Sequence, residues 1–154
     1  MKQPNPAYIR ELIAVVNDSA FPRHLPMRLT EIEMDRATVE LDVDSCHLQL
    51  FGIVHGGVLA TLIDTATFWA VFLPLPDGDG LVNIDLKLNY LKPVREGRIR
   101  ARGRCIRAGR SISYAEAGVV DETGRLLAHG TSTLMHLPGK GIRFEAPKFL
   151  NTTA

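Results

Sequence analysis

Sixteen residues from Val58 to Leu73 form the most apolar run of the chain, and only three threonines and Asp64 interrupt it. The run is too long for an ordinary strand, and it is too short to span a membrane with polar residues inside it. Apolar side chains fall on every face of a helix built from this run, so the pattern predicts a helix that is buried all round. The rest of the chain then has to fold around that helix.

Asp64 is the one carboxylate in this predicted helix. The residues one turn away are alanine, threonine and phenylalanine, so no cation on the same helix can pair with it. Charged side chains are almost never fully buried without a partner, because desolvating a lone carboxylate is unfavourable. Asp64 therefore lies at a rim or meets an arginine from elsewhere in the chain, or it serves as a general base or nucleophile in a pocket.

His55, Gly56 and Gly57 directly precede the apolar run. The two glycines place two backbone N–H groups, unhindered by side chains, near the predicted helix start. A helix N-terminus combines such N–H groups with the positive end of the helix dipole, and it stabilises developing negative charge. The glycines can also serve only to allow a tight turn, and the two interpretations are compatible.

The composition is that of one globular domain. The 154 residues are enough for a real core, 45% of them are hydrophobic, and the net charge of +1 favours neither nucleic acid nor a membrane surface. Cys46 and Cys105 fit no metal or redox spacing, and the five histidines show no ligand spacing. We expect a cytoplasmic protein without signal peptide, metal or cofactor, because Arg10 and Glu11 interrupt any apolar segment near the start.

The remaining hydrophobic patterns predict one more helix and six strands. Apolar residues recur at helical spacing over about 6–20, residues 21–26 are typical of a loop, and 27–34 and 37–43 form the strands of a hairpin. Further strands are expected after the buried helix at 82–90, 99–106, 111–120 and 125–136. This order indicates an α+β fold in which an antiparallel meander wraps around one helix.

The domain core is expected over about residues 25–137, followed by a tail of about 138–154 with little structure. Within the core, the clearest strand pattern lies at 82–90, where apolar and polar residues alternate. Asn83 falls among the polar residues of this strand, on the face away from the apolar ones.

A row of arginines marks the strand at 99–106. Arg98, Arg100, Arg102 and Arg104 share one face, and Glu96 is the only acid near them in the sequence. Such a row is usually a solvated sheet face. The alternative is a site for a polyphosphate ligand, because the charge and fork geometry of arginine suit phosphate.

The spacing of Gly57 and Asp64 limits how they can act together. Seven residues separate them, which is about 10 Å along a helix axis at about 1.5 Å per residue. A single reacting group needs contacts of about 3 Å, so it cannot touch both groups of one chain. If both serve one reaction, they come from different copies, which predicts a two-fold dimer with antiparallel helices and shared sites.

The run from Gln49 to Ala66, with Gly52, His55, Gly56, Gly57 and Asp64 at fixed spacing, resembles the signature of hotdog-fold acyl-CoA thioesterases. The likeness is strongest to the PaaI-like type and to thioesterase superfamily member 2. It extends from about Val39 to His136 and includes Asn-Tyr-Leu-Lys-Pro at 89–93. It implies one hotdog domain, with five to six antiparallel strands around a long buried helix, that assembles as a homodimer and then as a dimer of dimers, a homotetramer.

The resemblance also implies roles for individual residues. Asp64 matches the general base or nucleophile, and Gly56 matches the residue whose N–H polarises the thioester carbonyl. His55 matches the histidine that shapes the turn and contacts the thioester region. Gln49 matches a side chain near the reacting centre. Asn83 aligns with a serine or threonine that holds the attacking water.

Substrate-binding groups are expected in addition to these. Gly57 would offer a second N–H at the helix start. The resemblance implies that a loop like Gly109-Arg110-Ser111, with basic residues, binds coenzyme A. Phe68 and the neighbouring aromatic residues could line an aryl pocket, although aromatic residues on such a helix are more often core.

The expected function is hydrolysis of an acyl-CoA with an aryl, small or medium acyl group, with no nucleic-acid or membrane partner. Asp64 would either deprotonate a water or attack the thioester to form an anhydride, and the sequence does not separate these routes. The alternatives are an acyl-CoA-binding sensor without catalytic activity, and a hydratase or dehydratase on the same fold.

Overall fold

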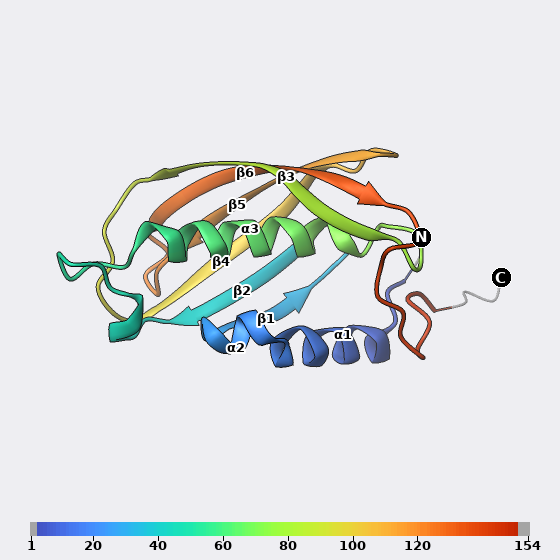
Figure 1. Ribbon diagram of the computed structural model, residues 1–154, viewed down its shortest axis with the longest axis horizontal. Coiled ribbons are helices and arrows are strands. Elements are labelled where there is room, and N and C mark those ends of the chain that lie inside the picture. The colour runs from blue at the N-terminus through green and yellow to red at the C-terminus, as the bar shows by residue number, and fades with distance from the viewer. Residues whose placement is uncertain (1–2, 151–154) are drawn as a thin grey trace.

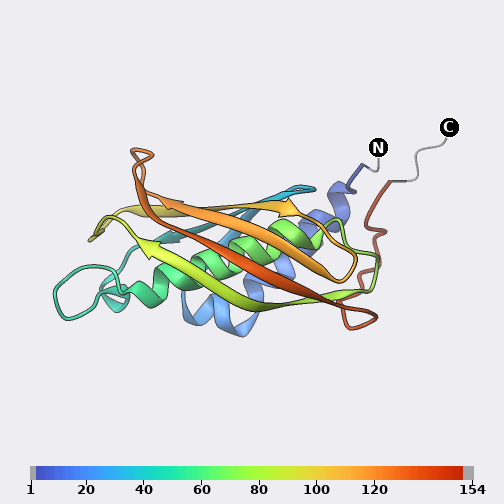
Figure 2. The same cartoon turned by 90° about the horizontal axis from the view of Figure 1, so that it is seen from above.

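A six-stranded antiparallel sheet curves around one long helix, α3, in the computed structural model, which describes residues 3–150 (Figure 1). The view from above shows the strands crossing α3 obliquely (Figure 2). The elements are α1 (Pro6–Asp18), α2 (Ala20–His24), β1 (Met27–Ile32), β2 (Arg36–Asp42), the short 3-10 helix η1 (Ser45–His47), α3 (Gly56–Phe72), β3 (Gly80–Tyr90), β4 (Arg98–Arg107), β5 (Ile112–Val120) and β6 (Leu126–Leu137). The predicted α+β fold is confirmed.

The strand order is β1-β2-β4-β5-β6-β3. The meander that the sequence predicts therefore holds for β4, β5 and β6. The strand that follows α3, β3, pairs with β6 instead of β4 and lies at the edge of the sheet. Among the described residues, the other side of β3 pairs with no strand.

The prediction that α3 is buried all round is wrong on one face. Ten of its seventeen residues are buried, and the backbone of Gly103 on β4 approaches so closely that a Cβ there would lie 2.1 Å from the Ala66 carbonyl oxygen. A stripe at helical spacing is more open, because Gly57 is exposed and Thr61, Asp64 and Phe68 are only half-buried.

The alternation in β3 predicts the wrong face for its first residues. A β-bulge between Asn83 and Asp85 shifts the register against β6. Asn83 pairs with the buried Leu134 and faces α3, whereas Val82 and Ile84 are exposed. After the bulge, Leu86 and Leu88 are partly buried against the core.

The loop expected at residues 21–26 contains the short helix α2. Backbone bonds from Arg23 to Ser19 and from Leu25 to Phe21 close its turns. Pro22 does not disturb it, because the first helical turn needs no N–H donor at that position.

The tail after β6 has neither helix nor long strand, as expected, but it is anchored. Buried Lys148 donates from Nζ to the Phe72 and Leu75 carbonyl oxygens at 2.9 and 3.0 Å, at the C-terminal end of α3 where a cation is favourable. The Phe144 ring packs edge-on against Tyr8 of α1. Residues 151–154 of the expected tail lie outside the described residues.

No helix in the described part of the chain is long and apolar enough to cross a membrane.

Candidate active site

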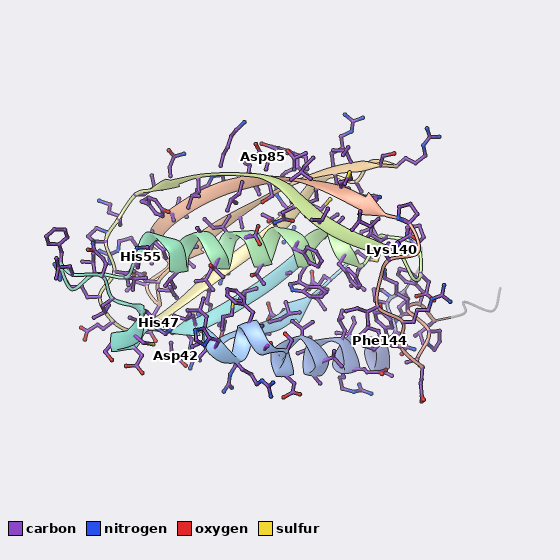
Figure 3. All side chains as sticks on the ribbon, in the orientation of Figure 1. Asp42, His47, His55, Asp85, Lys140 and Phe144 are labelled. Carbon is purple, nitrogen blue, oxygen red and sulfur yellow. The ribbon has the colours of Figure 1, made fainter. Side chains whose placement is uncertain are left out.

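His55 caps the N-terminus of α3 (Figure 3). Its Nδ1 accepts a hydrogen bond from the Gly57 N–H at 2.9 Å, and its carbonyl oxygen accepts one from the Val58 N–H at 2.9 Å. Within residues 3–150, the Gly56 N–H donates to no group. Of the two glycine N–H groups expected to be free, the one of Gly57 is therefore occupied and only that of Gly56 is available.

The loop before α3 is held by its own backbone and by Arg95. The Gly52 N–H donates to the Gln49 carbonyl oxygen at 2.8 Å, and the Phe51 N–H donates to Gln49 Oε1 at 3.3 Å. Gly52 has a φ of 68°, which a residue with a side chain rarely adopts. Arg95 Nη1 donates to the Gly52 carbonyl oxygen at 2.9 Å. The start of α3 is thus fixed before any substrate binds.

A cavity of about 400 Å³ lies beside Gly56. Its lining is mainly apolar and includes Gln49, Gly56, Tyr90 and Lys92. The Tyr90 hydroxyl donates to the Gly56 carbonyl oxygen at 3.1 Å. Gly56, whose N–H has no acceptor within residues 3–150, is therefore part of the cavity wall.

Asp64 is half-buried and bonded to Asn83 of β3. Asn83 Nδ2 donates to the Asp64 carboxylate at 2.5 Å and to its backbone oxygen at 3.2 Å. Both partners are acceptors, which fixes the orientation of the amide, so its Oδ1 points elsewhere. That oxygen is buried and has no partner within residues 3–150. Asp64 is half-buried, and its partner is an amide rather than the arginine that one interpretation expected.

Two expected binding elements, the Gly109–Ser111 turn and Phe68, do not lie next to Gly56 within one chain. β4 starts next to Asp42, near the N-terminal end of α3, and runs away from it, so the turn with Gly109, Arg110 and Ser111 lies at the opposite end of the sheet (Figures 1 and 3). Phe68 packs edge-on against Trp69, with ring centroids 4.9 Å apart.

The arginine row lies on the sheet face away from α3 and is largely paired. Arg98 bonds Asp42, Arg100 bonds Glu40 and Arg104 bonds Glu116. Glu96 is thus not the only nearby acid, because β2 and β5 supply carboxylates across the strands. These pairs favour the solvated-face interpretation over a polyphosphate site.

Asp42 and Glu116 on this face have lowered pKa values. The hydrogen bond from Arg98 holds the pKa of Asp42 below its ordinary value, and the one from Arg104 does the same for Glu116. Among the described residues, no group of three His, Cys, Asp or Glu side chains could hold a metal ion.

Sequence reasoning missed two residues that support the site, Tyr90 and Arg95. Tyr90 belongs to the Asn-Tyr-Leu-Lys-Pro segment, but no pattern along the chain indicates that its hydroxyl reaches Gly56. Arg95 stands beside the arginine row, yet it donates to a loop 43 residues earlier.

Comparison with known proteins decides the family. The model of the family described as the thioesterase superfamily matches residues 51–128, about half of the chain. This chain belongs to the thioesterase superfamily. The proofreading thioesterase EntH of Klebsiella pneumoniae is 33% identical over 123 residues, which cover 77% of this chain and 90% of that protein.

Solved structures agree with this membership. A thioesterase of Haemophilus influenzae matches with a TM-score of 0.81 and 26% identity over 94% of this chain and all of that one. The phenylacetic acid degradation protein PaaI of Thermus thermophilus, in a mutant form, matches with a TM-score of 0.68 and 28% identity over 75% and 96%. The hotdog fold is confirmed, and the protein is a thioester hydrolase.

Proposed function

We propose that this thioesterase hydrolyses coenzyme A esters of aryl, small or medium acyl groups, by attack of a water molecule on the thioester carbonyl with Asp64 as general base. The proposal rests on two groups of α3. This helix has one N–H free at its start, beside a cavity, and one carboxylate held in place by an amide.

The chemistry follows from these groups. The thioester carbonyl oxygen accepts a hydrogen bond from the Gly56 N–H, where the helix dipole also stabilises the charge that develops. A water donates a hydrogen bond to the Asp64 carboxylate, which Asn83 holds in place. Its proton passes to Asp64 as its oxygen bonds the carbonyl carbon. The intermediate then collapses, the C–S bond breaks, and the thiolate takes the proton from Asp64.

The site is formed by two copies of the chain. Gly56 and Asp64 are eight residues apart on one helix, which is about 12 Å along its axis, too far for one carbonyl and its attacking water. The open edge of β3 supports a dimer, because an eleven-residue edge strand with exposed Val82 and Ile84 is prone to pair. Antiparallel pairing of two β3 strands brings the half-buried stripe of each α3 toward the partner's.

The dimer also accounts for the distant binding elements. A two-fold axis beside β3 brings the far end of the sheet, with Gly109, Arg110 and Ser111, toward the N-terminal end of the partner subunit's α3. We assign coenzyme A to this turn and the acyl group to the surface next to Phe68. The dimers pair further into tetramers, and the protein acts in the cytoplasm.

The test is Asp64→Asn with a panel of aryl, short-chain and medium-chain acyl-CoAs. We expect the variant to bind coenzyme A esters while its kcat falls at least about 100-fold, because the general base is lost. A wild type that binds these esters and hydrolyses none would instead be an acyl-CoA sensor. Light scattering tests the shared site, since a monomer with full activity contradicts it.

A further inference from the structure

The inference concerns Tyr90, and it rests on the proposed function. β3 runs antiparallel to α3 and contacts both of its functional groups (Figure 1). Asn83, near the start of β3, holds Asp64, and Tyr90, at its end, donates to the Gly56 carbonyl oxygen at 3.1 Å. We propose that Tyr90 is a positioning residue, which keeps the Gly56 N–H aimed into the cavity where the thioester carbonyl binds.

The Tyr90 ring lies directly against Gly56. A Cβ on Gly56 would lie 2.8 Å from Tyr90 Cζ and 2.9 Å from its hydroxyl oxygen. The φ of Gly56 is not positive, so backbone conformation alone does not require a glycine. Glycine lets the tyrosine approach this closely, and a Cβ at this position would push the tip of the Tyr90 side chain away.

Contacts on both sides immobilise Gly56. The hydroxyl of Tyr90 holds its carbonyl oxygen, and His55 accepts from the next N–H. Of the N–H groups of Gly56 and Gly57, that of Gly56 has no acceptor within residues 3–150. Within one chain Tyr90 is 57% exposed, so its contact with Gly56 there depends on the hydroxyl and the ring tip rather than on burial in the core.

Small displacements matter at such a donor. The N–H must lie within about 2.7–3.1 Å of the developing oxyanion, and a misplacement of about 1 Å can lower a rate about 100-fold. Because Tyr90 also lines the cavity beside Gly56 and Gln49, the same side chain sets both the donor and the adjoining wall.

The first experiment compares Tyr90→Phe and Tyr90→Leu with wild type on a hydrolysed acyl-CoA. We expect kcat to fall about 10-fold when the hydroxyl is lost and about 100-fold when the ring is lost, with KM within about twofold and an unchanged melting temperature for Tyr90→Phe. Tyr114→Phe is the matched control, because Tyr114 is 40% exposed on β5 and its hydroxyl makes no hydrogen bond within residues 3–150. It should behave as wild type.

The second experiment tests the contact itself. Gly56→Ala should lower the melting temperature and kcat, because the new Cβ displaces the Tyr90 ring. Adding Tyr90→Ser makes room, so the double variant should regain the melting temperature and stay catalytically impaired. No recovery of the melting temperature would overturn the claim that a Cβ at residue 56 displaces Tyr90.

The outcomes separate this inference from the proposed function. Wild-type kcat in both Tyr90 variants, or an equal loss in Tyr114→Phe, overturns the positioning role and leaves the hydrolase assignment intact. The proposed function is tested separately, by wild type alone. If wild type hydrolyses no acyl-CoA, both the proposed function and the role of Tyr90 in that reaction are overturned.

Discussion

Asn83 shows how much of the site depends on a single side chain. Two acceptors of Asp64 take its N–H groups, so its Oδ1 points away from the carboxylate and is buried without a partner within residues 3–150. The serine or threonine that the resemblance places here has one hydroxyl, which can rotate. The amide of Asn83 cannot turn in this way, because exchanging its ends would place Oδ1 against two acceptors. Its N–H groups therefore always face Asp64.

We predict that Asn83→Asp lowers kcat about 100-fold. The replacement keeps the shape of the side chain, but it removes the donors to Asp64 and places a second negative charge beside it. Steady-state kinetics with one acyl-CoA measures the effect. Wild-type turnover in Asn83→Asp would show that this amide has no part in the reaction.

At the residue scale, the sequence identifies those candidate site residues that differ in type from their neighbours along the chain. Asp64 is conspicuous in an apolar run, and Gly56 is conspicuous before a helix. The direction of Asn83 is not predictable in this way, because a bulge that leaves no mark in the alternation turns it toward α3. The role of Tyr90 depends on a contact across 34 residues of chain.

At the element scale, the outer face of the sheet is a set of cross-strand ion pairs. Arg104 donates to Glu116 Oε1 from Nη2 at 2.7 Å and from Nε at 3.1 Å, and His129 lies 3.5 Å from the other carboxylate oxygen. Arginine and glutamate residues of neighbouring strands stand directly opposite one another in the register. Pairs of this kind stabilise the sheet modestly and keep its outer face polar.

Glu116→Gln should lower the free energy of unfolding by up to about 1 kcal/mol at pH 7, the upper range for an exposed pair. Arg104 lowers the pKa of Glu116 in the folded state below its ordinary 4.5. The stabilisation is therefore present above about pH 4.5 and is lost as the pH falls through the lower folded-state pKa.

The difference between wild type and Glu116→Gln should accordingly shrink and vanish in acid. Urea unfolding at low ionic strength measures it without screening the pair. Glu33→Gln is the control, because Glu33 forms no ion pair within residues 3–150. A difference that persists unchanged at acidic pH would mean that the carboxylate charge is not the cause.

Element types were predictable where one periodicity covers a whole segment. The strands β2, β4, β5 and β6 end within about two residues of their predicted bounds, because their alternation is regular and turn residues separate them. The short helix α2 was not predictable, because five residues carry too little periodicity and a proline within them indicates a loop. The position of β3 at the sheet edge depends on tertiary pairing, which no local pattern records.

At the scale of the whole molecule, one isolated chain leaves its functional groups apart. Gly56 lies at the start of α3, Asp64 lies about 12 Å further along it, and the Gly109–Ser111 turn lies at the other end of the sheet. The spacing along the helix predicted this separation from the sequence alone. The open edge of β3 and the half-buried stripe on α3 are structural features that a second copy would cover.

Mixed dimers of two inactive variants test the shared site directly. Asp64→Asn removes the base. Gly56→Pro removes the N–H donor at a position where the helix accepts proline, since Gly56 is the first residue of α3 and His55 already has extended backbone angles of −63° and 137°. Tyr90→Ser accompanies Gly56→Pro to make room for its ring. Each variant alone should be inactive.

If Gly56 of one subunit works with Asp64 of the other, a mixed dimer holds one site with both defects and one site with none. Random pairing of equal amounts makes half of all dimers mixed, so the mixture should recover about 25% of wild-type activity. If both groups act within one chain, every site carries a defect and the mixture stays inactive. Because two different homodimers can share one tetramer, the activity of the whole co-expressed mixture is measured against wild type at equal chain concentration.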